Sequence, residues 1–323
     1  MRQGIAVAGS ILVDNIYEIS AYPSAGELTQ IRSLKKSVGG CVPNVAVDLK
    51  KISPDTPIYA IGKVGDDENG AYVKETFGGA GVDASGVLTS ASEPTSFTDV
   101  MSVVGGQRTF FTYAGASATF GFDEMALENF PAKMLHLGYF LLLDKVDGGD
   151  GERILKAAKE RGVVTSIDLV SENSDRYAIV KPCLPYTDNL IINEVEAGKI
   201  TGIAPEKENL KRIAETLAQM GVCERVIIHT PEVGVCLHQG VWTVVPSYEL
   251  PKEYIQGTTG AGDAFCAGCL VGIYEGATDE EILALGSKAA VASLGAADAT
   301  SGLVEKPQLE NVVKGLKRKE ICL

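Results

Sequence analysis

The amino-acid sequence predicts an α/β fold in which a mostly parallel sheet is flanked by helices. Short apolar runs, such as residues 4–9 and 58–64, alternate with longer segments of helical periodicity, such as residues 43–52. This alternation is typical of parallel strands joined by crossover helices. Two segments, residues 12–38 and 95–113, interrupt it with the pattern of β-hairpins, which predicts a small second sheet.

The elements follow in order along the chain. Val45, Leu49 and Ile52 recur at helical spacing in the first expected helix,. We expect strands at residues 4–9, 58–64, 134–137, 163–168, 190–192 and 225–229. We expect helices at residues 43–52, 71–78, 152–161, from 193 onward, 206–220, 261–274 and 279–294. Residues 233–237 and 241–245 predict an antiparallel hairpin around Gly240,.

The two interrupting hairpins are expected to form a lid. Their strands do not fit easily into a parallel sheet, and Gly105-Gly106 is a tight-turn dipeptide in the second hairpin,. We therefore expect one α/β domain over residues 1–323, with lid strands inserted at about 12–38 and 95–113. Exposed sheet edges need covering, so a homodimer through the lid is a further hypothesis.

The composition excludes several classes of protein. The 323 residues hold 29 Lys and Arg against 42 Asp and Glu, a net charge of −13, which argues against binding nucleic acid,. No run of 18 apolar residues appears, so no membrane-spanning helix is expected,. The seven cysteines show no disulfide framework, which predicts a cytoplasmic protein,. The CxxC pair Cys266 and Cys269 lies in an apolar run, which favours buried packing over metal or redox chemistry,.

The most informative motif is a glycine-rich turn that opens a helix at residues 257–265. The free N–H groups of Gly260, Ala261 and Gly262, aligned with the helix dipole, would form an anion hole suited to phosphate. Asp263 would lie beside the anion and could accept a proton from an attacking hydroxyl. The alternative is that Asp263 only caps the helix. Neither a Walker A loop nor a dinucleotide fingerprint is present,.

Two further motifs offer polar groups for a small ligand. Gly39 and Gly40 precede a helix that contains Asn44, and paired glycines allow close approach of a polar molecule,. Asp14, which follows the first strand, would suit two sugar hydroxyls. The alternative for the glycine pair and Asn44 is an ordinary turn into a helix. The alternative for Asp14 is an aspartate in a surface loop.

A fourth motif follows the strand at residues 190–192. Asn193 and Glu196 share one helix face, where Glu196 could hold Mg²⁺ directly or through water,. The alternative is a helix start that is simply rich in acidic residues.

Taken together, these motifs resemble the ribokinase-like (PfkB) carbohydrate kinase family over nearly the whole chain. The resemblance implies a doubly wound α/β fold with a β-sheet lid, and transfer of the γ-phosphate of ATP to a hydroxymethyl group with Mg²⁺. By position, Asp263 resembles the catalytic base, and Gly260, Ala261 and Gly262 resemble the anion hole.

The resemblance also assigns the remaining site residues. The substrate side would comprise Asp14, Gly39, Gly40 and Asn44. Separately from the resemblance, Arg108 on the lid could contact an acidic sugar or stack on a nucleobase, which would add it to the substrate side. The nucleotide side would comprise Asn193, Glu196, Thr230, Gly234 and Thr259, with Glu196 at the magnesium ion and Asp168 near the phosphates. The alternative to a role in substrate binding is that Arg108 is simply solvated and that its neighbours pack within the lid.

Several positions depart from the family pattern. Ribokinases have asparagine, lysine and glutamate where this chain has Leu12, Cys41 and Gly138, which argues against ribose as the substrate,. Gly257 replaces an aspartate that belongs to a monovalent-cation site, so potassium activation is not expected. Pro231 stands in the adenine-side loop, where it lacks an N–H group,.

These observations lead to one main hypothesis and two alternatives. The main hypothesis is an ATP-dependent sugar kinase acting on a primary hydroxyl. A nucleoside kinase of the same family would need an apolar pocket, for which Leu12, Cys41, Phe97 and Phe111 are candidates. A non-catalytic sugar-binding sensor is the other alternative, and the intact Asp263 motif argues against it.

Overall fold

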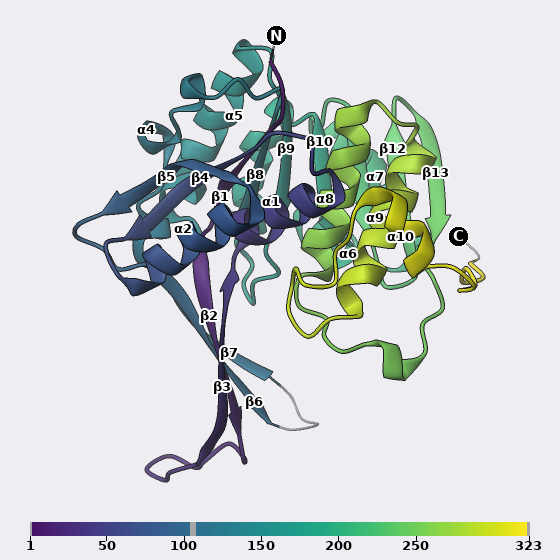
Figure 1. The fold of residues 1–323 in the computed structure, drawn as a ribbon. Coiled ribbons are helices and arrows are strands. Elements are labelled where there is room, and N and C mark those ends of the chain that lie inside the picture. The colour runs from purple at the N-terminus through teal and green to yellow at the C-terminus, as the bar shows by residue number, and fades with distance from the viewer. Residues whose placement is uncertain (1, 104–107, 322–323) are drawn as a thin grey trace.

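A computed structural model describes residues 2–103 and 108–321, which form a large sheet between two layers of helices (Figure 1). Within these residues the sheet has nine strands in the order β13-β12-β11-β10-β9-β8-β1-β4-β5. All neighbours are parallel except β11–β12 and β12–β13. The strands are β1 Ile5–Gly9, β4 Ile58–Gly65, β5 Asp83–Ser90, β8 Met134–Phe140, β9 Val164–Leu169, β10 Asn189–Asn193, β11 Arg225–His229, β12 Val233–His238 and β13 Val241–Pro246.

Helices cover both faces of the sheet because its central strands are apolar on both sides. In β1, Ile5 and Val7 pack into one core and Ala6 and Ala8 into the other,. The helices are α1 Cys41–Ile52, α2 Glu68–Ala80, α3 Gly115–Ala118, α4 Phe122–Met125, α5 Gly151–Glu160, α6 Glu194–Thr201, α7 Leu210–Gln219, α8 Ala261–Glu275, α9 Asp279–Leu294 and α10 Lys306–Val312. Within the described ranges, no helix has the length and apolar character needed to cross a bilayer.

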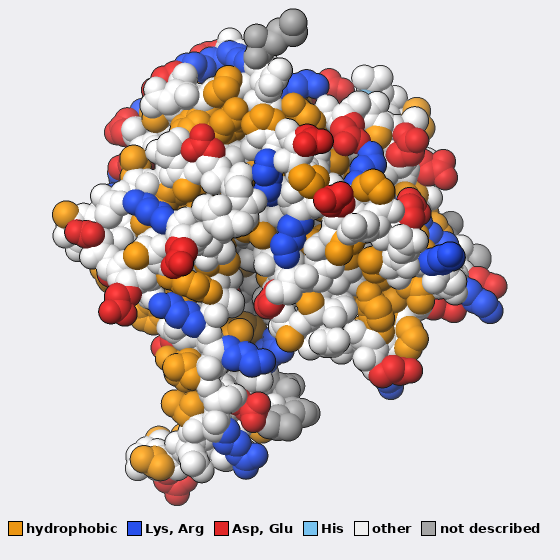
Figure 2. All heavy atoms as spheres, in the orientation of Figure 1, with side chains coloured by type: hydrophobic (Ala, Val, Ile, Leu, Met, Phe, Trp, Pro, Cys, Tyr) orange, Lys and Arg blue, Asp and Glu red, His pale blue; other side chains and the backbone are white. Residues whose placement is uncertain are grey.

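A second sheet projects from the main body, as the hairpin patterns predict (Figure 1). We call it the lid. Its strand order is β3-β2-β6-β7, with β2–β3 and β6–β7 antiparallel and β2–β6 parallel. The strands are β2 Leu12–Ile19, β3 Ile31–Gly39, β6 Ser96–Val103 and β7 Arg108–Tyr113. The predicted turn at Gly105-Gly106 lies outside the described residues. Figure 2 shows hydrophobic side chains on the surface of this projection.

The structure differs from the sequence prediction mainly at short or polar elements. Strand β5 was not expected, because it lies at the sheet edge and only three of its eight residues are buried. The predicted helix at 206–220 begins with a 3₁₀ turn, Lys207–Asn209, and is α-helical only from Leu210. Cys266 and Cys269 are buried free thiols in α8, as the apolar run predicts.

The start of α1 packs directly against the end of β8. Cys41 is fully buried, and a Cβ atom added to Gly138 would lie only 1.9 Å from its sulfur. Glycine at position 138 therefore makes room for the cysteine side chain, and the pair fixes how closely α1 approaches the sheet.

We expect Gly138→Ala to lower the free energy of unfolding by about 1–3 kcal/mol, because the added methyl group overpacks this contact. Urea denaturation measures the change. Gly78→Ala is the matched control, since a Cβ atom there meets nothing within 4 Å and the residue lies in α2. Combining Gly138→Ala with Cys41→Ala should recover part of the loss. Equal stability of Gly138→Ala and the wild type would contradict this packing account.

Candidate active site

The N-terminus of α8 is open and presents an aspartate. Gly260 precedes the helix with φ 82°, and a Cβ atom there would lie 2.4 Å from the side chain of Ala299,. No side chain caps this helix, so the N–H groups of its first turn, which includes Ala261 and Gly262, are available to an anion,. Asp263 lies in the same turn and is 6% exposed. Its carboxylate makes side-chain contacts with other elements, so it does not serve as the cap.

The carboxylate of Asp263 is held by two hydrogen-bond donors. The Asn44 amide Nδ2 donates to Oδ2 over 2.8 Å, and the Tyr139 hydroxyl donates to the same oxygen over 2.9 Å. Burial, together with the nearby carboxylate of Asp168, raises the pKa of Asp263 to about 7, against the lowering effect of the two donors,. A carboxyl group with a pKa near neutrality is suited to act as a general base.

Asp14 faces the same site from the lid strand β2. Burial raises the pKa of its carboxyl group to about 6, and its charge contributes to the raised pKa of Asp263. Gly39 lies opposite, where a Cβ atom would come within 2.3 Å of Oδ2 of Asp14. Gly40 has φ 87°, and a Cβ atom there would lie 2.7 Å from the carbonyl oxygen of Ser10. The structure thus brings Asp14, Gly39, Gly40, Asn44 and Asp263 together.

A cavity of about 680 Å³ opens beside the first turn of α8. Of the residues predicted on the nucleotide side, Asn193 and Thr230 line it, together with Ala261 and Gly262. Its wall is largely apolar and includes Ile255, Phe265, Val291 and Leu294. Gly234 does not line the cavity. It packs against the Phe265 ring, because a Cβ atom added to Gly234 would lie 3.2 Å from the nearest ring carbon.

Glu196 lies below the surface at the start of α6. Its Oε2 accepts from the Asn193 backbone N–H over 3.1 Å, while the Asn193 side chain accepts from the Glu196 N–H over 2.9 Å. The Ser171 hydroxyl donates to the other carboxylate oxygen over 2.9 Å. Burial raises the pKa of Glu196 to about 8. Glu196 therefore orients Asn193, and its oxygen atoms are of the kind that Mg²⁺ prefers.

The lid reaches the loop that precedes the anion hole. Arg108 Nη1 donates to the Thr259 hydroxyl over 3.1 Å, and both residues line a second cavity of about 470 Å³ together with Phe110 and Gly257. Arg108 and Thr259 are therefore partners in this structure, although the sequence analysis placed Arg108 on the substrate side and Thr259 on the nucleotide side.

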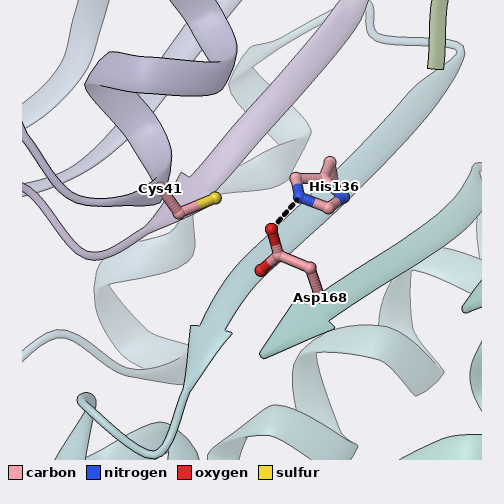
Figure 3. A group of neighbouring side chains, drawn as sticks. All are labelled: Cys41, His136 and Asp168. Atoms are coloured by element: carbon pink, nitrogen blue, oxygen red, sulfur yellow. Dashed lines mark ion pairs between the residues drawn. The ribbon is translucent and has the colours of Figure 1, made fainter. Parts of the chain in front are cut away.

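A buried polar cluster lies on the inner side of the site (Figure 3). It joins Cys41 of α1, His136 of β8 and Asp168 of β9, whose potential ligand atoms lie within 4.8 Å of one another. His136 Nε2 lies 3.3 Å from Oδ2 of Asp168, and the Tyr139 N–H donates to Oδ1 over 2.7 Å. Burial and the neighbouring carboxylates raise the pKa of the Cys41 thiol well above its usual value. These ligand types suit a transition metal, yet protein groups already occupy both Asp168 oxygens and the thiol stays protonated.

Sequence reasoning missed two residues of this region, His136 and Tyr139. His136 stands in an apolar strand with no motif around it, and its role emerges only from the pairing of β8 with β9. Tyr139 is the penultimate residue of the same strand and has φ 61°, a left-handed conformation that is uncommon for a residue other than glycine,. A tyrosine after a buried strand carries no signal for either feature.

Comparisons with known proteins identify the family. The model of the pfkB family of carbohydrate kinases matches residues 2–306. The chain belongs to this family. It is therefore a carbohydrate kinase, an enzyme that transfers a phosphoryl group to a hydroxyl group, and the family predicted from the motifs is confirmed.

This carbohydrate kinase is similar in sequence to named relatives and in fold to solved structures. Ribokinase from Arabidopsis thaliana is 28% identical over 317 residues, which cover 97% of this chain and 81% of that protein. Fructokinase-1 from Zea mays is 24% identical over 287 residues, 83% of this chain and 82% of that protein. The solved structure of Arabidopsis thaliana ribokinase complexed with ribose and ATP has a TM-score of 0.84 at 25% identity and covers 97% of this chain and 99% of its own. A nucleoside kinase from Methanocaldococcus jannaschii, with a TM-score of 0.78 at 20% identity over 97% of this chain and 99% of its own, shares the fold.

The raised pKa of Glu196 predicts a specific dependence of stability on pH. The folded protein binds this proton more tightly than the unfolded chain, whose carboxyl has the ordinary pKa of 4.5. The free energy of unfolding therefore falls as pH rises from about 4.5 to about 8,. In Glu196→Gln this contribution is absent, so stability should fall less between pH 5 and pH 8, by about 3–4 kcal/mol.

Urea denaturation of the nucleotide-free protein at the two pH values measures this difference. Glu215→Gln, an exposed carboxylate of α7, is the control and should follow the wild type. Identical pH dependence in Glu196→Gln and the wild type would show that Glu196 does not titrate in this range.

Proposed function

We propose that this carbohydrate kinase transfers the γ-phosphoryl group of ATP to a primary hydroxyl group of a sugar or sugar derivative. The observation that carries the proposal is the buried carboxylate of Asp263, with a pKa of about 7, beside the uncapped N-terminus of α8. The use of ATP is further supported by the relative whose structure was solved with ribose and ATP. The match to the family model over residues 2–306 supports one catalytic domain with an inserted lid.

The site residues suggest how the reaction proceeds. Asp14 accepts hydrogen bonds from sugar hydroxyls, while Gly39 and Gly40 let the sugar approach the backbone,. Asp263 takes the proton of the acceptor hydroxyl as its oxygen attacks the γ-phosphorus. The new O–P bond forms as the bond between the γ-phosphorus and the bridging oxygen breaks, and ADP leaves. The N–H groups of Ala261 and Gly262 stabilise the charge on the phosphoryl group.

The cavity beside α8 is the proposed nucleotide site. Its volume of about 680 Å³ and apolar wall suit a nucleobase, and its lining includes Ala261 and Gly262, where phosphates would bind,. Thr230 and Asn193, which also line it, offer polar contacts. Thr259 and Gly234 act indirectly, through the contact with Arg108 and the packing of Phe265.

Mg²⁺ fits the nucleotide side of this site. Asn193 and Glu196 supply hard oxygen donors, and the raised pKa of the buried Glu196 carboxyl indicates a place where added positive charge would stabilise the ionised form,. Because both Glu196 oxygens accept hydrogen bonds, we assign Glu196 to hold the ion through Asn193 and water. A bound Mg²⁺ neutralises charge on the transferring phosphates.

The lid favours a sugar over a nucleoside as the substrate. Asp14, Thr98 and Thr112 lie opposite one another in the register of β2, β6 and β7, so their side chains share the face towards the site,. Phe97 and Phe111 alternate with these residues and lie on the other face,. Phe97 and Phe111, two of the residues considered for a nucleoside pocket, are therefore turned away, while Phe110 shares the face of Thr112,. The carboxylate of Asp14 and the hydroxyl groups of Thr98 and Thr112 on the inner face support a sugar as the substrate.

Two further properties are proposed. Gly257 has no side chain that could bind a cation, and a Cβ atom there would lie 3.0 and 3.1 Å from the carbonyl oxygens of Ala296 and Ala297. Because the carboxylate of the monovalent-cation site is missing, turnover should not depend on potassium. The cysteines that the structure describes are all free thiols, which supports a location in the reducing cytoplasm,.

An ADP-release assay with MgATP and a panel of sugars, sugar acids and nucleosides tests the function. We expect turnover with a sugar or sugar derivative, and a 10²- to 10⁴-fold lower kcat in Asp263→Asn. In the wild type, kcat/KM should fall as pH drops below about 7, because protonated Asp263 cannot accept the hydroxyl proton. Asp123→Asn, an exposed carboxylate in the first turn of α4, is the control.

The same assay separates the alternatives. Preference for a nucleoside would overturn the sugar assignment while keeping the kinase. Sugar binding in calorimetry without ATP turnover would support a non-catalytic sensor. Near-normal turnover in Asp263→Asn would remove the proposed base.

The lid is also the proposed dimer contact. It ends in two edge strands, β3 and β7, that carry exposed Ile31, Leu34, Phe110 and Phe111. Open edges with exposed apolar side chains favour pairing with a second copy. We expect light scattering at micromolar concentration to show a dimer that Leu34→Glu combined with Phe110→Glu converts to a monomer. Val241→Glu, an exposed position on β13, should leave the dimer intact, and a wild-type monomer would refute the proposal.

A further inference from the structure

Tyr139 joins two carboxylates of the active site. Its backbone N–H donates to Oδ1 of Asp168 over 2.7 Å, and its hydroxyl donates to Oδ2 of Asp263 over 2.9 Å. The left-handed backbone of Tyr139, φ 61°, allows both groups to reach the site from the end of β8. Tyr139 thus adopts an uncommon backbone conformation at a position where its N–H and its hydroxyl both donate to active-site carboxylates.

The two donors to Asp263 converge on one oxygen. Asn44 Nδ2 and the Tyr139 hydroxyl both contact Oδ2. Among the described residues, no hydrogen-bond donor contacts the other oxygen, Oδ1. The carboxylate is thus fixed at one oxygen, while the second keeps its lone pairs for another partner.

Tyr139 can act only as a donor in this contact. Burial and the charges of Asp263 and Asp168 raise the pKa of its phenol well above the usual value, so the hydroxyl keeps its proton at any pH at which the enzyme works. A hydroxyl that stays protonated stabilises the ionised carboxylate more than the protonated one.

We propose that Tyr139 is a positioning residue for the base: together with Asn44 it holds Oδ2 of Asp263, so that Oδ1 receives the proton of the acceptor hydroxyl. This inference rests on the proposed function for its catalytic consequence. The hydrogen bond itself, and its effect on the proton affinity of Asp263, does not depend on the identity of the substrate.

The surroundings of Asp263 set the direction of the effect. The titratable groups that face it are Asp14 of β2, Asp168 of β9, Cys41 and Asp48 of α1, and Cys266 of α8. The ionised carboxylates among them disfavour a further negative charge, so the donors from Asn44 and Tyr139 oppose this repulsion,. Removing the Tyr139 hydroxyl should therefore raise the pKa of Asp263.

The decisive variant is Tyr139→Phe, which keeps the ring and removes the donor. The first readout is a ¹³C NMR titration of protein labelled at the aspartate carboxyl carbons, with the Asp263 resonance assigned by its loss in Asp263→Asn. We expect the wild-type resonance to titrate near pH 7 and the variant about one pH unit higher,. The second readout is the acid limb of kcat/KM on the sugar that the panel identifies, which should move by the same amount.

Tyr274→Phe is the matched control. Its hydroxyl accepts a hydrogen bond from the Gly4 N–H over 2.9 Å, at the far end of α8 from Asp263. This variant should leave both readouts unchanged. A protein with p-aminophenylalanine at position 139 keeps an N–H donor and should restore the titration towards the wild-type value, which separates loss of the donor from damage to the fold.

The two readouts keep the inference separate from the proposed function. An unshifted Asp263 titration in folded Tyr139→Phe overturns the role of Tyr139, and so does a lower kcat with an unchanged acid limb. If the resonance shifts while the wild type transfers no phosphate to any compound of the panel, the positioning contact stands and the proposed function fails.

Discussion

Asp263 is a carboxylate that the fold removes from water at the start of an apolar helix, and the rest of the site is arranged around it. Isolation of a charged group from solvent is costly unless donors replace the lost water. The donors come from two other elements, the amide of Asn44 in α1 and the hydroxyl of Tyr139 at the end of β8. The mutual placement of α1, β8 and α8 is therefore as necessary to the site as the glycine-rich turn itself.

Close backbone approach makes that placement possible. Gly138 lets the sulfur of Cys41 lie over β8, and Gly39 leaves space for the Asp14 carboxylate. The chain resembles ribokinases, yet it carries this cysteine–glycine pair where they have lysine and glutamate. The small pair brings α1 against the sheet and places no charged side chain there for a ligand. In the proposed function, substrate selection therefore rests on Asp14 and the hydroxyl groups of the lid. The same fold can thus accept a different sugar by changes at a few contacts.

Much of the fold and the outline of the site could be predicted from the sequence because their signals are local. Apolar runs and helical periodicity mark the central strands and long helices, and the turn at Gly260 with Asp263 predicts an anion site within one stretch of chain. The contact between Tyr139 and Asp263 spans 124 positions and depends on a backbone conformation that tyrosine rarely adopts. The sequence gives no signal for His136 either, since its partner Asp168 becomes a neighbour only when β8 and β9 pair. Strand β5, with its polar edge residues, lacks the apolar pattern that marks the other strands.

In the proposed reaction, Asp263 deprotonates the acceptor hydroxyl at the open end of α8. A crystal structure with the sugar substrate and a non-hydrolysable ATP analogue is the most direct test of this step. We expect the acceptor oxygen within hydrogen-bond distance of Oδ1 of Asp263 and the γ-phosphate at the N–H groups of Ala261 and Gly262. An acceptor hydroxyl bound away from Asp263, or phosphates bound away from the start of α8, would contradict it.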